Sequence, residues 1–322
     1  GAARLINTQR PNGSFGGGGQ GGIVDTTFAL LFLVRGRAPV LYNRLEYEGD
    51  WNNRPRALAN LTRWVSGKFE KEVNWQIISF KAPVEDWHDA PVVLISGSKA
   101  PTFSDEQLAK LRTYVWQGGM LLSVTECGGA AFDKGIREVY GKLFPEYELR
   151  ELPPDHPIYS SHFPLTRPSK LYGIFNGIRL LAVHCGEDLI LPWQMNNYAT
   201  GANQFKLGFN VAYYTTDKAS LRHRGTSNWP SAKAVVPLRV VQVARVKHSG
   251  NWNPEPLAWE RFGMLLGQQY QTKLVVKVSG AEDLDASSVR VAVLTGTGSL
   301  SLSGAEKSAL KRISRIESDL PR

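Results

Sequence analysis

The chain has 322 residues, of which 42% are hydrophobic and 21% are charged. This is the composition of a globular protein that is long enough for two domains with separate cores. The longest apolar run, Phe28 to Val34, is too short to cross a bilayer. Lys and Arg outnumber Asp and Glu by 38 to 29, but no stripe of basic and aromatic residues indicates nucleic-acid binding.

Residues 1–36 differ in composition from the rest of the chain. A glycine cluster that ends at Gly22 precedes an apolar segment, which predicts a loop followed by a helix. Asp25 or Thr26 is suited to accept hydrogen bonds from the free N–H groups at the start of that helix. The cluster has neither a preceding strand nor a following Lys-Ser/Thr pair, so it does not predict a phosphate-binding loop.

Residues 37–192 alternate between buried strand patterns and amphipathic helix patterns. Strands are predicted over 40–47, 75–80, 91–96 and 120–125, with further strand within 171–184, and helices over 54–70, 104–117 and 130–144. Ser104 and Gln107 form a capping signature at the start of the second helix. This alternation predicts an α/β unit with a parallel sheet and helices on both faces.

Residues 193–234 are rich in Asn and aromatic side chains, and we interpret them as a helical and loop insertion with a helix over 205–221. Residues 235–322 repeat the alternation. A strand from 235, a helix from 255, strands over 274–278 and 289–295, and a helix from 303 are predicted.

Two stretches 201 residues apart are nearly the same. Arg44, Trp51 and Pro55 recur as Arg245, Trp252 and Pro256. Further on, the segment that ends at Gly97 recurs at Gly296, with a shift of 199 residues. A repeat of this length predicts two copies of one folding unit. The second copy is incomplete, because it has no counterpart of the strand at 120–125.

A catalytic or binding site is expected beyond the carboxyl ends of the parallel strands, where loops and helix N-termini meet. Three turns of the first copy reach that edge. They comprise Gly49, Asp50, Trp51 and Asn52; Gly97 and Ser98; and Glu126, Cys127, Gly128 and Gly129. In the third turn a buried strand leads into Cys-Gly-Gly and then a helix, which is typical of a turn that exposes a nucleophile. Cys127 is therefore the candidate nucleophile.

This strand–turn–helix arrangement resembles the class I glutamine amidotransferases and their flavodoxin-like fold. Their turn reads Gly-x-Cys-x-Gly, whereas this chain has Thr125 at the first position and lacks their His-x-Glu. A catalytic Cys needs a base and a group that orients the base. The candidates are His184 with Glu187, and His156 with Asp155; Glu126 is a candidate acid or base.

A closer resemblance covers most of the chain. Segments such as Gly49-Asp-Trp-Asn, Cys127-Gly-Gly, Asp155-His-Pro and Asn203-Gln-Phe-Lys-Leu-Gly208 are similar to the bacterial domain-of-unknown-function family 4159. The resemblance implies an amidotransferase-like fold in a large protein associated with the cell envelope or periplasm. Gly13-Ser-Phe-Gly and the following helix resemble the closing repeat of a prenyltransferase/squalene-cyclase-like helical toroid.

Each candidate also has a structural interpretation. Cys127 is a small residue that suits a tight turn, Glu126 favours a helix start, and His156 can hold a turn through side-chain hydrogen bonds. Trp51 and Trp252 recur together, as packing residues shared by both copies would. No spacing of His, Cys or carboxylates indicates a metal site, and no cofactor is predicted.

Three functions are consistent with these observations. The first is a non-catalytic amidotransferase-like module of a larger bacterial protein that binds a partner protein, another domain of the same polypeptide or a small polar ligand. The second is a Cys-dependent hydrolase or amide-transferring enzyme that uses Cys127. The third is a carbohydrate-binding module that uses Trp51, Asn52 and the loop from Trp193 to Tyr198.

Overall fold

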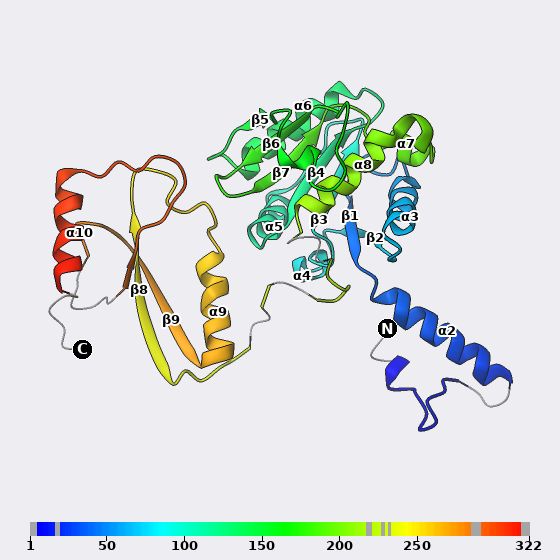
Figure 1. The fold of residues 1–322 in the computed structure, drawn as a ribbon, viewed down its shortest axis with the longest axis horizontal. Coiled ribbons are helices and arrows are strands. Elements are labelled where there is room, and N and C mark those ends of the chain that lie inside the picture. Colours follow the sequence, from blue (N-terminus) through cyan, green and yellow to red (C-terminus); the bar gives the residue numbers. More distant parts are fainter. Residues whose placement is uncertain are drawn as a thin grey trace. The chain divides into compact units, whose positions relative to one another are not determined.

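The computed structural model describes residues 5–16, 20–216, 221–226, 229–230, 233–284 and 291–316. The chain forms two compact units. The first comprises residues 1–174 and 181–227, and the second comprises residues 175–180 and 228–322. Figure 1 labels the elements of both.

The first unit is built on a seven-stranded, mostly parallel sheet of order β2-β1-β3-β4-β7-β6-β5. The strands are β1 (Val40–Glu46), β2 (Asn74–Ser79), β3 (Val92–Gly97), β4 (Met120–Thr125), β5 (Leu149–Glu151), β6 (Leu171–Phe175) and β7 (Leu180–Cys185). β1 pairs in parallel with β2 and β3, and β4 pairs in parallel with β3 and β7. β5 pairs antiparallel with β6, an edge that the sequence patterns do not predict. A three-residue strand is too short to show alternation.

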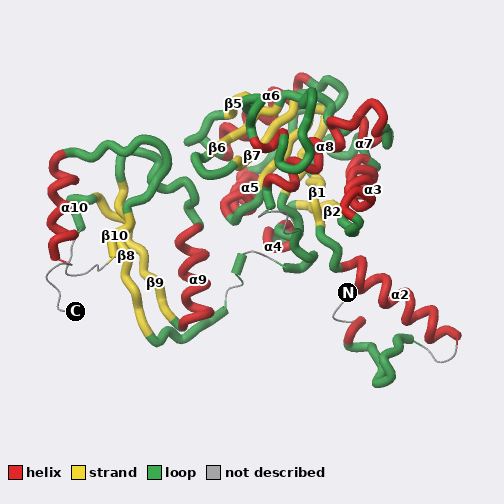
Figure 2. The backbone as a smooth tube through the Cα atoms, in the orientation of Figure 1, coloured by secondary structure: helices red, strands yellow, loops and turns green. Residues whose placement is uncertain are grey.

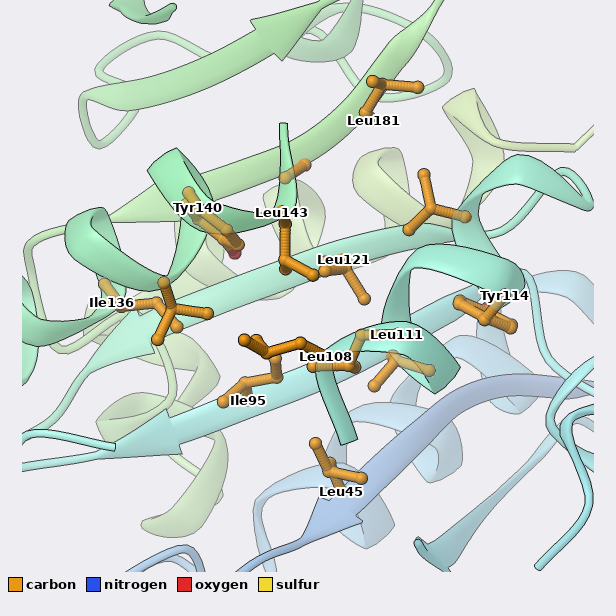
Figure 3. Close-up of a cluster of buried hydrophobic side chains, with 14 of the residues drawn as sticks. Leu45, Ile95, Leu108, Leu111, Tyr114, Leu121, Ile136, Tyr140, Leu143 and Leu181 are labelled. Carbon is orange, nitrogen blue, oxygen red and sulfur yellow. The ribbon is translucent and has the colours of Figure 1, made fainter. Parts of the chain in front are cut away.

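One face of this sheet packs against α5 (Asp105–Trp116) and α6 (Ala130–Leu143). Their apolar side chains form one cluster with side chains from β1, β3 and β4, as Figure 3 shows. The strands contribute Leu45, Ile95 and Leu121 to this cluster, and the helices contribute Leu111 and Ile136. Because side chains alternate along a strand, the residues between these point to the opposite face.

The opposite face carries α3 (Ala57–Phe69), α7 (Leu191–Gln194) and α8 (Tyr198–Tyr214), which contact one another. Tyr42 on β1 donates a hydrogen bond from its hydroxyl to the carbonyl of Gly208 on α8. Phe205 and Phe209 of α8 are buried in this layer. The helix predicted over 205–221 corresponds to α8, which begins at Tyr198 and ends at Tyr214. This helix belongs to the first compact unit.

Two short helices complete this unit, α4 (Val84–Trp87) and the 3-10 helix η1 (Pro157–Tyr159). The N-terminal segment contributes α2 (Gln20–Gly36). Asp25 and Thr26 lie inside α2 rather than at its start, so the predicted cap is wrong. The Thr26 hydroxyl instead donates a hydrogen bond to the Gly22 carbonyl. Among the described residues, no helix has both the length and the apolar character needed to span a membrane.

The second unit contains β8 (Arg239–Lys247), β9 (Thr272–Gly280) and β10 (Val291–Val293), with α9 (Ala258–Tyr270) and α10 (Gly304–Ile316). The sheet has the order β10-β8-β9, and both pairings are parallel. Figure 2 shows these strands side by side. Ser303 caps α10, because its hydroxyl accepts from the Glu306 N–H while the Glu306 carboxylate accepts from the Ser303 N–H. Part of the strand predicted over 289–295 lies outside the described residues.

Candidate functional site

The turn at Cys127 joins the buried strand β4 to α6. Cys127 has φ +53°, in the left-handed region that non-glycine residues seldom adopt, and its side chain is exposed. Gly128 follows with φ +65°. Gly129 lies so close to the backbone of Ser98 that a Cβ atom would overlap the Ser98 carbonyl. The two glycines thus let a sharp turn lift the thiol out of the sheet.

The Cys127 side chain is held by an arginine. Nη2 of Arg54 lies 3.1 Å from Sγ of Cys127 and 2.8 Å from Oδ2 of Asp188. The same Asp188 oxygen accepts a hydrogen bond from the Cys127 N–H at 3.0 Å. Arg54, Cys127 and Asp188 therefore form a closed cluster at the carboxyl ends of β4 and β7. The thiol is free, and so is the thiol of buried Cys185.

Below this cluster, Arg44 anchors the loop that carries Arg54. Its guanidinium donates to the carbonyl of Trp51 at 3.1 and 2.9 Å and to the carbonyl of Arg54 at 2.5 Å. It also lies 5.9 Å from the centre of the Trp51 ring. Arg44 is 1% exposed, and its nearest anion is Glu126, which is 0% exposed and lies at 3.7 Å.

Glu126 occupies a buried site rather than a solvent-exposed edge. Burial raises the pKa of Glu126, and the nearby polar side chains of Ser96 and Asn53 and the charge of Arg44 lower it in part. Breaking a buried ion pair leaves an uncompensated charge in a poorly solvated site. Glu126 and Arg44 thus form part of the support beneath the turn.

Asp50 links the turn at Gly49–Asn52 to the turn at Gly97 and Ser98 through hydrogen bonds. Its carboxylate accepts hydrogen bonds from the N–H and hydroxyl of Ser98, the N–H of Lys99 and the side chain of Asn53. Burial alone would raise the pKa of Asp50, but these hydrogen bonds outweigh it and hold the pKa at about 2. Gly97 is packed against this arrangement, because a Cβ there would lie 2.8 Å from Oδ1 of Asp50.

The remaining loop residues lie at the same edge. Gly49 has φ +145°, and a Cβ there would lie 2.9 Å from the Tyr47 ring. Trp51 is half-buried against the core, and Asn52 is exposed. The structure therefore brings together all three turns at the carboxyl edge of the sheet.

His184 is not part of this cluster. It is fully buried, and its Nδ1 lies 2.8 Å from the Ser123 hydroxyl while its Nε2 lies 2.7 Å from Oδ1 of Asp133. β4 and β7 pair Ser123 with His184. Ser123 lies four residues before Cys127, and a strand rises about 3.3 Å per residue. His184 is therefore deeper in the sheet than the turn that carries Cys127. Burial lowers the pKa of His184, and the Asp133 carboxylate opposes this in part.

His156 and Glu187 also have other positions. His156 is the N-cap of η1, and its Nδ1 accepts a hydrogen bond from the Ile158 N–H at 3.2 Å. Glu187 is exposed, and it precedes Asp188, whose carboxylate is the group that reaches the turn. Trp193 is 0% exposed, so its ring does not face solvent. In the described ranges, no group of three or more His, Cys, Asp or Glu side chains is arranged to hold a metal ion.

Sequence reasoning missed Arg54, Asp188 and Arg44. Arg54 lies three residues after Trp51, and Asp188 follows Glu187 just beyond a strand end. Both lie at the edge where a site is expected, so a search of all charged residues there would have included them. Arg44 recurs as Arg245, which was a signal that its role is structural in both places.

Comparison with known proteins gives one family. No curated protein gives a significant match to the chain. Residues 38–216, more than half of the chain, match the family model described as Domain of unknown function (DUF4159). The matched range includes Arg44, Arg54, Cys127 and Asp188. The chain belongs to the DUF4159 family.

Proposed function

We propose that the first unit is a non-catalytic amidotransferase-like module that binds a partner at the edge formed by Asp50, Arg54, Ser98 and Cys127. One observation carries this proposal. The Cys127 thiol is held by the guanidinium of Arg54, and both nitrogens of His184 have other partners. A cysteine nucleophile is usually activated by a neighbouring base, and an arginine is always protonated and cannot accept the proton.

The strand order supports the amidotransferase-like fold. Strands β2-β1-β3-β4-β7 lie in the order in which flavodoxin-like sheets place their strands, 2-1-3-4-5. The thiol follows β4, the central strand of the sheet, at its carboxyl end. Apolar side chains exposed along α2, such as Ile23, Phe28 and Val34, are consistent with our expectation that residues 1–36 are the end of a helical repeat.

We also infer that the second unit is a partial copy of the first. The order β9-β8-β10 parallels β2-β1-β3. Arg245 lies 5.0 Å from the Trp252 ring centre, as Arg44 lies over Trp51. The hydroxyl of Tyr47 donates to the carbonyl of Ser96, and His248 contacts the carbonyl of Thr295 through Nε2 at 3.1 Å.

The test measures turnover and thiol reactivity on the full chain. We expect no release of ammonia from glutamine or from simple amides. We expect iodoacetamide to alkylate the exposed Cys127 thiol at a rate that does not depend on an imidazole, because both ring nitrogens of His184 have other partners. The Cys127→Ser variant gives the background. Turnover that this variant abolishes would refute the proposal.

A Cys-dependent enzyme is the second candidate, and one observation favours it. Cys127 is exposed and held at φ +53° between a strand and a helix. Strained backbone of this kind often occurs at functional sites. The turnover assay distinguishes the two candidates directly.

A further inference from the structure

The loops at the sheet edge of the second unit contact a turn of the chain. Residues 175–180 belong to this unit and include a tight turn, in which the Asn176 side-chain oxygen accepts from the N–H groups of Ile178 and Arg179 at 2.9 Å. Asn251 donates from Nδ2 to the carbonyl of Asn176 at 2.7 Å. This turn therefore lies directly on the loop that contains Trp252.

A charged pair holds the other end of the turn. Arg179 donates to Glu255 through Nε at 2.7 Å and Nη2 at 3.3 Å. Asn176 also donates from Nδ2 to Glu255 at 2.8 Å, and Asn176 is 1% exposed. Gly177 fits against Thr297, where a Cβ would overlap the threonine side chain. The edge thus recognises a protein turn through an amide donor, a carboxylate and a small-residue contact.

The corresponding residues of the first unit have the opposite hydrogen-bonding role or charge. The repeat places Asp50 at the position of Asn251, Arg54 at that of Glu255 and Ser98 at that of Thr297, with shifts of 201, 201 and 199 residues. An amide donor is therefore replaced by a carboxylate acceptor, and an acid is replaced by a base. The Asp50 carboxylate already accepts hydrogen bonds from Ser98, Lys99 and Asn53, so the change that a ligand must match is an acid facing position 54.

A carboxylate already occupies the second of these places. Asp188 accepts from Arg54 at 2.8 Å and from the Cys127 N–H at 3.0 Å. Its side chain is 15% exposed, and that of Arg54 is 17% exposed. The pair is therefore partly exposed, and Asp188 shows where a ligand carboxylate would sit.

We propose that the edge of the first unit binds a turn of a partner protein that carries an acidic residue, which takes the place of Asp188 on Arg54. The inference rests on the proposed binding function, and it names the class of partner. The turn presents its acid to Arg54 and the Cys127 N–H. Asp188 fills the position when no partner is bound.

Two cyclic hexapeptides test this on the full chain by calorimetry. One carries residues 175–180, Phe-Asn-Gly-Ile-Arg-Leu. The other has the single change Arg179→Glu, so that it keeps the turn held by Asn176 and offers a carboxylate to Arg54 where the first peptide offers a guanidinium. We expect the wild type to bind the second peptide at least tenfold more tightly than the first. Equal binding of the two, or a preference for the first, would overturn the proposal.

Two sets of variants make the test independent of one substitution. Asp188→Asn keeps an acceptor for the Cys127 N–H but removes the competing charge, so the acidic peptide should bind about tenfold more tightly. Asp50→Asn with Arg54→Glu and Ser98→Thr brings the polar groups of the second edge into the first, and the preference should invert. Glu255→Gln is the control and should leave binding of the acidic peptide unchanged.

The outcomes separate this inference from the proposed function. If Cys127 shows no turnover and the peptides are not distinguished, the binding module stands but its ligand is not an acidic turn. If Cys127 shows turnover, the binding proposal fails whatever the peptides do.

Discussion

The Arg44→Met substitution tests the support beneath the Cys127 turn. It removes hydrogen bonds to the carbonyls of Trp51 and Arg54 and leaves Glu126 buried without its cation. Breaking a buried pair by removing one partner costs about 3–5 kcal/mol. Arg245→Met in the second unit is the matched control. Arg245 donates at 2.8 Å to the neutral side chain of Asn253, so we expect a cost of only about 1–2 kcal/mol.

The effect should depend on pH, and its sign follows from Glu126. The pKa of this carboxyl is raised above 4.5 in the folded chain, so protonation favours folding. Stability linked to Glu126 is present below the unfolded pKa and is lost as the pH rises through the folded pKa. Without Arg44 the folded pKa rises further. The destabilisation by Arg44→Met should therefore be smaller near pH 4.5 than at pH 8.

Hydrogen exchange measured by mass spectrometry can follow each unit separately, through peptides from β1 and from β8. In Arg44→Met the peptide over Val40–Glu46 should exchange at least a hundredfold faster at pH 8, since 1.4 kcal/mol corresponds to about tenfold. Equal effects of Arg44→Met and Arg245→Met on their own strands would refute the reasoning. So would a cost that is the same at both pH values.

Three further predictions concern the surroundings of the site. His184→Leu should destabilise the first unit by about 1–3 kcal/mol in urea unfolding, because it leaves the buried Ser123 hydroxyl without its partner. Because burial lowers the pKa of His184, the wild type should lose stability as the pH falls below 6.5 through the folded pKa, and the variant should lose less. Gly129→Ala should cost about 1–3 kcal/mol because its Cβ overlaps the Ser98 carbonyl, whereas Gly141→Ala in open space on α6 should stabilise by about 0.5–1 kcal/mol; equal melting temperatures of the two variants would contradict this.

Much of the fold could be predicted from local patterns. The strands β1 and β3 and the helices α5 and α6 lie within a few residues of their predicted ranges, because buried runs and helical spacing are strong signals. The turn at Cys127 was also visible, because two glycines follow a buried strand. The short antiparallel edge of β5 and β6 was not visible, since pairing direction depends on tertiary contacts rather than on sequence period.

The location of the candidate site could be predicted, but the side chains that form it were harder to predict. Cys127 and Asp50 lie at the predicted edge, but the groups that hold the thiol, Arg54 and Asp188, are 134 residues apart and have no local pattern. His184 ends a strand in the sequence, but pairing with β4 places it beside Ser123, deeper in the sheet. Sequence order along a strand does not give the depth of a residue until the register with its neighbour is known.

The rate of Cys127 alkylation in wild type and His184→Leu, followed from pH 6 to pH 9, tests the central claim most directly. If the thiol depends on Arg54 and Asp188 and not on an imidazole, the two rate profiles should agree within about twofold at every pH. A tenfold or greater fall in the rate near neutral pH in His184→Leu, with the fold intact by circular dichroism, would show that the imidazole activates the thiol and would contradict the account.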